Sequence, residues 1–162
     1  MAGNEPVSQR AWRAACPNCG APVEFRSAAS TSAVCGFCRS TLARDGDSVR
    51  RTGEVAELFD DHSPLQLGAH GRLQGVSFTL IGRLQLAYAE GTWNEWHAWF
   101  DNGRSAWLSE DNGAYVLSFE TPLEGRPPAA DELKVGTRQV LLGTAWDVAS
   151  AVKARLISAQ GE

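Results

Sequence analysis

The sequence predicts a mainly β protein: an N-terminal four-cysteine zinc ribbon, then a small antiparallel SH3-like β-barrel or meander, with a partial second β repeat. Three observations predict this fold. The four cysteines form two C-x2-C pairs near the start, glycines separate short runs rich in Val, Phe, Trp and Leu from residue 65 onward, and Asn-Gly occurs twice between such runs. With 162 residues, 43% of them hydrophobic, the chain is long enough to bury a core.

These patterns divide the chain into four predicted parts. Residues 1–52 form the ribbon with an N-terminal tail, residues 53–64 a linker, and residues 65–124 a β-barrel-like domain with tryptophan hairpins. Residues 125–162 either begin a second β repeat or supply strands that close the first sheet.

The cysteine spacing is that of a tetrahedral metal site. Cys16 and Cys19 form one pair, Cys35 and Cys38 form the other, and fifteen residues separate the pairs. Four thiolates fill the coordination shell of Zn²⁺ and leave no position for a catalytic water, so the prediction is one structural zinc ion. Iron is the alternative metal for the same ligands, and two disulfides or four free thiols are the alternatives to a metal.

The local sequence favours the metal over these alternatives. Residues 1–15 are polar and lack the apolar segment of a signal peptide, which predicts a cytoplasmic protein with reduced thiols. A ribbon this short depends on a metal for stability, and Gly20 and Gly36 are expected to ease the two cysteine turns. No apolar run approaches the roughly 20 residues of a membrane span, so no membrane insertion is expected.

Charge is unevenly distributed along the chain. Residues 1–53 have seven basic and four acidic side chains, a balance of +3, and the remainder has eight basic and fifteen acidic, a balance of −7. A basic ribbon makes nucleic-acid binding one alternative function, but the larger part is acidic and no Lys/Arg run occurs. Arg13, Arg26 and Arg39 are instead expected to offset the negative zinc–thiolate centre.

The strongest β signal lies in residues 93–120. The Asn-Gly pairs at 102–103 and 112–113 predict a three-stranded meander, because both residue types tolerate positive φ. Alternation along the first strand puts Trp96, Ala98 and Phe100 on one face, and Trp93, Glu95, His97 and Trp99 on the other. The candidate residues for binding a ligand or partner are Trp93, Glu95, Trp96, Trp99 and Trp107, and packing within the core is the competing interpretation of the tryptophans.

No catalytic residue is predicted. Glu95 and His97 share a strand face, yet residues two apart on a strand are ordinary neighbours, and His97 is expected to be a half-buried partner of Glu95. The sequence has no nucleophile elbow and no Gly-rich phosphate loop, so we do not expect an enzyme. Glu95 is expected to face solvent, to pair with Arg83 or Arg104, or to bind a cationic ligand.

A weaker pattern repeats with an offset of 68 residues. Leu65-x-Leu67-Gly68 and the following Leu73, Gly75, Phe78 and Leu80 recur as Leu133-x-Val135-Gly136, then Leu141, Gly143, Trp146 and Val148. A second copy of this unit would lack its own tryptophan hairpin, which suggests that the sequence is a fragment of a longer protein. Strands that complete the first sheet are the competing explanation.

Several motifs together resemble a bacterial family catalogued as a domain of unknown function. They are Leu67-Gly68, Phe78 to Arg83, Trp93-Asn-Glu-Trp96, Phe100-Asp-Asn-Gly103 and Trp107-Leu-Ser-Glu110 followed by Gly113. The resemblance covers about residues 14–162 and implies a mostly β domain, often behind an N-terminal zinc ribbon and sometimes in tandem. Members that occur near genes for polyamine-synthesis-like enzymes and small membrane proteins imply an accessory role, and the resemblance supplies no catalytic residues.

The favoured function is therefore a non-catalytic zinc-ribbon module that binds a protein or peptide partner. One alternative is a domain that binds a small polyamine-like cation, with tryptophan faces and Glu95 as the site. The other alternative is weak nucleic-acid binding through the ribbon.

Overall fold

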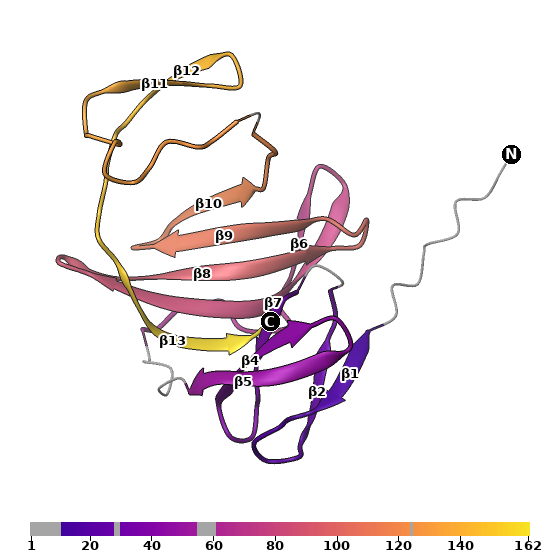
Figure 1. The fold of residues 1–162 in the computed structure, drawn as a ribbon. Helices are drawn as coiled ribbons and strands as arrows, with labels where there is room; N and C mark the ends of the chain where they lie inside the picture. Colours follow the sequence, from indigo (N-terminus) through magenta and orange to yellow (C-terminus); the bar gives the residue numbers. More distant parts are fainter. Residues whose placement is uncertain (1–10, 28–29, 55–60, 124) are drawn as a thin grey trace, which may run out of the picture.

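The computed structural model describes residues 11–27, 30–54, 61–123 and 125–162, which form thirteen β-strands and no helix (Figure 1). The predicted all-β fold is confirmed. Residues 1–10 of the predicted N-terminal tail and half of the predicted linker at 53–64, namely residues 55–60, lie outside the described residues. Within the described residues, no helix is long and apolar enough to cross a membrane.

The four-cysteine ribbon, residues 12–54, consists of two small antiparallel sheets. Strand β1 (Trp12–Ala15) pairs with β2 (Pro22–Phe25), and β4 (Ser40–Asp45) lies between β3 (Ser32–Val34) and β5 (Ser48–Glu54). Its core is small and consists of the buried residues Cys16, Val23, Phe25, Ala33, Cys35 and Leu42. The alternation of Val23 and Phe25 with polar neighbours in β2 is what turns both side chains toward this core.

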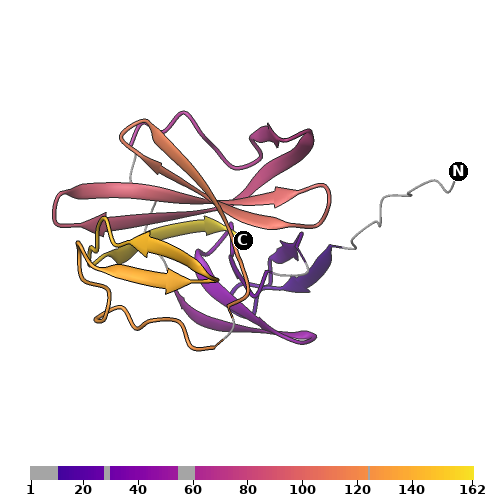
Figure 2. The same ribbon diagram turned by 90° about the horizontal axis from the view of Figure 1, so that it is seen from above.

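The main sheet is a six-stranded antiparallel sheet that curls into a half-barrel (Figures 1 and 2). Its strands are β6 (His70–Leu73), β7 (Val76–Tyr88), β8 (Gly91–Phe100), β9 (Ser105–Asp111), β10 (Ala114–Phe119) and β13 (Arg155–Gly161). The order is β10-β9-β8-β7-β13, with β6 paired to the first part of β7. The predicted meander is therefore β8-β9-β10.

The concave core of this sheet comes from the strand face that the sequence predicts. Trp96, Ala98 and Phe100 of β8 are buried together with Leu80 and Ala106. Phe100 contacts two further aromatic rings, those of Phe78 and Phe119, at centroid distances of 5.0 and 5.6 Å.

The two Asn-Gly turns differ in their backbone geometry. Asn112 and Gly113 have φ values of 47° and 80°, as a two-residue type I′ hairpin requires. In the first turn only Gly103 has positive φ (82°), and its N–H donates to the carbonyl of Phe100 at 2.9 Å. The longer loop at 101–103 is thus a three-residue turn, in which Asn102 needs no positive φ.

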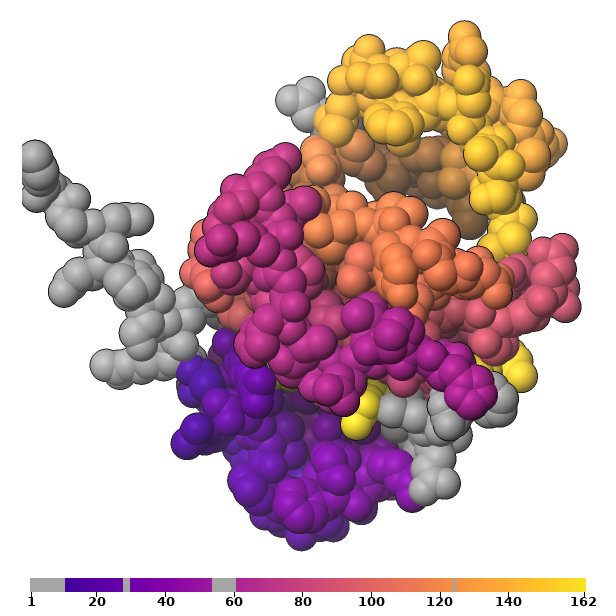
Figure 3. All heavy atoms as spheres, turned by 180° about the vertical axis from the view of Figure 1, so that it is seen from behind, coloured from indigo at the N-terminus to yellow at the C-terminus, as the bar shows by residue number. Residues whose placement is uncertain are grey.

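Residues 125–162 form two structures: an additional strand of the main sheet and a separate hairpin. Strand β13 pairs with β7 and extends the main sheet, where Gly82 and Gly161 allow a close approach. A Cβ at Gly82 would overlap the carbonyl of Glu162, and one at Gly161 would overlap the carbonyl of Ile81. Strands β11 (Arg138–Leu141) and β12 (Thr144–Asp147) form a separate hairpin. We call residues 125–154 the hairpin lobe, and Figure 3 shows this lobe standing apart from the main sheet.

Candidate functional site

The two cysteine turns of the ribbon have the same backbone structure. The N–H of Cys16 donates to Ala21 and the N–H of Gly20 donates back to Cys16, both at 2.8 Å. The second turn repeats these two bonds, from Cys35 to Ser40 and from Arg39 to Cys35, at 3.0 and 2.9 Å. Each turn therefore aims its two sulfurs at the same side, toward the other turn.

The residue with positive φ occupies the same place in both turns. Gly20 has a φ of 77° and Arg39 a φ of 56°, each four residues after the first cysteine of its turn. The expectation that Gly36 supplies the permissive backbone is wrong, because Gly36 is absent from the residues with positive φ and Arg39 adopts the left-handed conformation instead.

The four sulfurs form a cluster with the dimensions of a metal site. All four lie within 4.8 Å of one another, and two pairs, Cys16–Cys38 and Cys19–Cys35, are 3.7 Å apart. A tetrahedron with metal–sulfur distances of about 2.3 Å has edges of about 3.8 Å. All four cysteines are free thiols rather than disulfides. The cluster is thus compatible with binding one metal ion.

The four thiols differ in exposure and in pKa. Cys16 and Cys35 are buried, whereas Cys19 is exposed. Hydrogen bonds from the Asn18 side chain and from Ser40 lower the pKa of the Cys38 thiol to about 5. At Cys19 a backbone hydrogen bond at Ala21 has the same effect, but hydrogen bonds with Cys38 and the other thiols outweigh it and raise the pKa to about 12. Arg13, which was expected to offset the thiolate charge, lies instead 3.4 Å from Glu24 on the neighbouring strand.

The candidate tryptophans do not form one cage. Trp96 is buried on the core face, where its indole N–H donates to Glu110 at 2.9 Å. On the opposite face, Trp93 donates to Glu95 at 2.8 Å. Trp107 is 39% exposed and stacks on His97 with ring centroids 5.2 Å apart.

The remaining candidate, Trp99, is half-buried between Thr79 of β7 and Ser105 of β9. The five candidates therefore separate into one core residue, the Trp93–Glu95 pair, Trp107 on His97, and Trp99 at the other end of the strand.

Glu95 and His97 are not partners, contrary to expectation. Besides Trp93, Glu95 accepts the hydroxyl of Ser109 at 2.9 and 2.8 Å, so neutral donors hold its carboxylate. Strand alternation puts the two residues on one face of β8, but the side chain of each bonds to a serine of the neighbouring strand β9 and not to the other residue. His97 lies within hydrogen-bond distance of Ser105 (3.0 Å) and of the Glu162 carbonyl (3.1 Å).

A polar network that the sequence did not reveal lies between β7, β8 and β9. Asp61 accepts from Arg83 at 2.6 Å and from Asn94 at 2.7 Å, and the Arg83 guanidinium also lies over the Trp96 ring. The Arg83 hydrogen bond counteracts the effect of burial and lowers the pKa of Asp61 to about 2. Alternation indicates that Asn94 shares the Trp96 face, but nothing in the sequence brings Asp61 to it.

Glu110 is the centre of this network. Its buried carboxylate accepts from Trp96, Asn94, Ser63 and Tyr115, at distances between 2.7 and 3.3 Å. The network lies beside a cavity of about 380 Å³ that includes Asp61 and Glu110 among its lining residues. Because both carboxylates are already engaged, this network stabilises the sheet rather than presenting a free acid.

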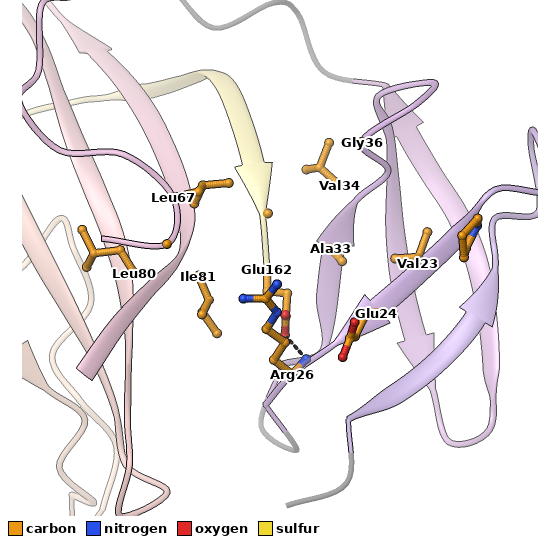
Figure 4. A pocket seen from close by; sticks show the side chains of 13 residues that line it. Val23, Glu24, Arg26, Ala33, Val34, Gly36, Leu67, Leu80, Ile81 and Glu162 are labelled. Carbon is orange, nitrogen blue, oxygen red and sulfur yellow. Dashed lines mark hydrogen bonds between the residues drawn. The ribbon is translucent and has the colours of Figure 1, made fainter. Parts of the chain in front are cut away.

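Glu162 joins the ribbon to the main sheet (Figure 4). Its carboxylate accepts from the backbone N–H groups of Arg26 (2.6 Å) and Ser27 (3.2 Å), and its own N–H donates to the Ile81 carbonyl (3.0 Å). A cavity of about 320 Å³ lies at this junction, lined by residues of both parts. Burial raises the pKa of the Glu162 carboxyl despite these hydrogen bonds.

Protonation of His97 is expected to weaken the fold. Burial lowers the pKa of His97 below its ordinary value of 6.5, so the unfolded chain binds a proton more readily than the native one. This contribution to the free energy of unfolding is present above about pH 6.5 and is lost as the pH falls. Urea unfolding measured from about pH 7.5 to about pH 5 should show a smaller loss of stability in His97→Gln than in the wild type.

The matched control is His62→Gln, which replaces an exposed histidine. It should keep the wild-type pH dependence. The same slope in His97→Gln and in the wild type would show that His97 is not the group responsible.

The fold thus defines a class: a four-cysteine ribbon followed by a curled antiparallel sheet with an additional hairpin. A family model described as Domain of unknown function (DUF4178) matches residues 66–162. The chain belongs to this family. The match starts later than the predicted resemblance at residue 14, so it covers the main sheet and the hairpin lobe but not the ribbon. Neither the curated proteins nor the solved structures gave a match to the chain.

Proposed function

We propose that this protein is a non-catalytic interaction module: one structural Zn²⁺ holds its ribbon, and its hairpin lobe binds a protein partner. The observation that carries the proposal is the apolar surface of the lobe. Val135, Val140, Leu142 and Trp146 are each more than half exposed, at 61%, 69%, 58% and 58%. Large apolar side chains left exposed on a surface are typical of protein-binding sites, and the register of the hairpin places Trp146 on one of its faces and Val140 on the other.

The proposal of zinc rests on the donor set. Four thiolates at tetrahedral spacing suit Zn²⁺, and together they complete its coordination shell. The metal would then crosslink the two cysteine turns and stabilise a ribbon whose own core is small. A reducing compartment such as the cytoplasm keeps the thiols available for the metal.

The proposal of a non-catalytic role rests on how the acidic and imidazole groups are used. Glu95 and Glu110 already accept hydrogen bonds from several neutral side chains, and His97 lies between Ser105 and a backbone carbonyl. These groups have structural partners on the sheet, which leaves them poorly placed for acid–base chemistry on a substrate.

Affinity capture with the full chain tests the proposed function. We expect a partner that the wild type retains and that Trp146→Ala loses, with zinc content and circular dichroism unchanged. The matched control is Phe37→Ala, which removes another exposed aromatic ring (77%) from the ribbon and should retain the partner. An identical set of retained proteins for wild type and Trp146→Ala would contradict the proposal.

A further inference from the structure

The β11–β12 hairpin repeats the β6–β7 hairpin in its hydrogen bonds. Gly68 donates to Leu80 at 2.8 Å, and Gly136 donates to Val148 at 2.9 Å, 68 residues later. The return bonds, Leu80 to Ala69 and Val148 to Thr137, are both 2.9 Å. The turns agree as well, since Gln74 and Gly75 have φ values of 48° and 86°, and Leu142 and Gly143 have 51° and 75°. The two segments are therefore copies of one structural unit.

In the first copy, a neighbouring strand completes the unit. Strand β7 pairs with β6 on one edge and with β8 on the other. Phe78 lies directly opposite Phe100 of β8, with ring centroids 5.0 Å apart. Outside the strand ladder, Asp101 also donates to the carbonyl of Ser77 on this edge, at 3.0 Å. In the first hairpin, an aromatic ring of the neighbouring strand β8 therefore packs against Phe78.

In the second copy, this neighbour is missing among the described residues. Strand β12 pairs with β11 and with no other strand that the structure describes. Trp146 occupies the position of Phe78 and is 58% exposed, and Val135 occupies the position of Leu67 and is 61% exposed. A repeat unit of this kind cannot bury its apolar face alone.

We propose that the free edge of β12 pairs with β12 of a second copy of this chain, which makes the protein a dimer with a four-stranded sheet across its two-fold axis. This proposal concerns the same lobe as the proposed function and rests on it. The pairing is antiparallel and centred on Trp146, so that the two indole rings lie opposite each other as Phe78 and Phe100 do in the first copy.

The backbone pattern of β12 fits this register. Thr144 is paired with Leu141 next to the two-residue turn, so its backbone N–H and carbonyl point toward β11. Backbone groups of successive residues in a strand point to alternate sides, and those of Ala145 therefore point toward the free edge. Ser77, at the same position in the first copy, uses its carbonyl on that edge to accept from Asp101. With Trp146 on the axis, Ala145 of one copy is opposite Asp147 of the other, and the outward backbone groups can bond.

The composition of the lobe favours a second copy over a strongly charged partner. The lobe, residues 125–154, contains four basic and three acidic side chains, so two lobes repel each other only weakly through a net charge of +1 each. Strand β12 contains no lysine or proline of the kind that commonly protects an exposed edge strand, and its one charged residue, Asp147, is already paired with Arg138 at 2.8 Å. A hairpin edge is smaller than a standard interface of about 1,600 Å², so we expect a dimer with a Kd of about 1–100 μM.

Sedimentation equilibrium of the full-length zinc-loaded protein tests this inference. The monomer mass is 17.4 kDa, so the dimer has twice that mass, 34.8 kDa. The wild type should approach the dimer mass at protein concentrations of a few hundred μM, which is several times the upper limit of the expected Kd. Two variants should remain monomeric there: Trp146→Ala removes the central ring, and Ala145→Pro removes the outward N–H donor.

The control is again Phe37→Ala, which should dimerise as the wild type does. Circular dichroism checks that each variant is folded. A wild type that stays monomeric throughout, or a dimer that both lobe variants preserve, would overturn the inference. If the wild type is monomeric but Trp146→Ala still loses a captured partner, the inference fails and the proposed function stands. If partner capture is also independent of Trp146, both fail.

Discussion

Replacing Cys35 with serine is expected to unfold the ribbon while the main sheet stays folded. Apart from the cysteines, the buried apolar residues of the ribbon core, among those that the structure describes, are Val23, Phe25, Ala33 and Leu42. Burial of one large apolar side chain contributes about 1.5–3 kcal/mol, which does not offset the entropy of ordering some forty residues. A bound structural zinc contributes about 10–16 kcal/mol in isolated zinc domains, so its loss removes the main stabilising term.

Two-dimensional NMR of the labelled protein measures this effect. In Cys35→Ser, the amide signals of residues 12–54 should move to the narrow range of chemical shifts of an unfolded chain. The amide signals of β7 to β10 should remain dispersed. A strong chelator should reproduce the spectrum in the wild type, and added zinc should reverse it. A Cys35→Ser spectrum with a fully dispersed ribbon would mean that the metal does not hold this part together.

Replacing Glu110 with alanine is expected to destabilise the main sheet by about 3 kcal/mol. The substitution leaves the buried indole N–H of Trp96 without its acceptor and removes one of the two carboxylates that accept from the Asn94 amide, which keeps its bond to Asp61. Each buried donor left without a partner costs about 1–3 kcal/mol. The carboxylate also holds Ser63, so the segment that carries Asp61 would lose one of its contacts with the sheet.

Urea denaturation followed by tryptophan fluorescence measures the change in the free energy of unfolding. Glu90→Ala is the matched control, because Glu90 is an exposed glutamate in the turn between β7 and β8, and it should change stability by less than about 0.5 kcal/mol. Equal midpoints for the two variants would show that the network around Glu110 contributes little.

The sequence predicts features that depend on neighbours along the chain. The C-x2-C spacing shapes each cysteine turn locally, and two such turns form the observed cluster of thiols. Alternation in the 93–100 run predicts the core face of β8, and the Asn-Gly pairs predict the order β8-β9-β10. Within the cysteine turns, the residue that has positive φ is less predictable, because in the second turn Arg39 and not a glycine adopts the left-handed conformation.

Contacts between residues far apart in the sequence could not be predicted from these local patterns. The partner of Arg83 is Asp61, 22 residues earlier in a segment without a periodic pattern. His97 lies next to Glu162, 65 residues away, because β13 returns to pair with β7. A side chain selects such partners after the sheet has formed, so strand periodicity gives its face but not the group that it meets.

The internal repeat shows the same distinction. The sequence indicates two related segments, and the structure gives them the same turn and the same hydrogen bonds. Whether the second segment has a neighbouring strand depends on chain packing, which the repeated residues do not specify. Trp146 is exposed where Phe78 is covered, although both positions carry an aromatic residue.

Metal analysis of the protein purified without added metal tests the central claim most directly. Elemental analysis should find one zinc per chain, and X-ray absorption should show four sulfur ligands at about 2.3 Å. A metal-free protein whose ribbon signals are nonetheless dispersed would contradict the claim that a thiolate-bound ion organises residues 12–54.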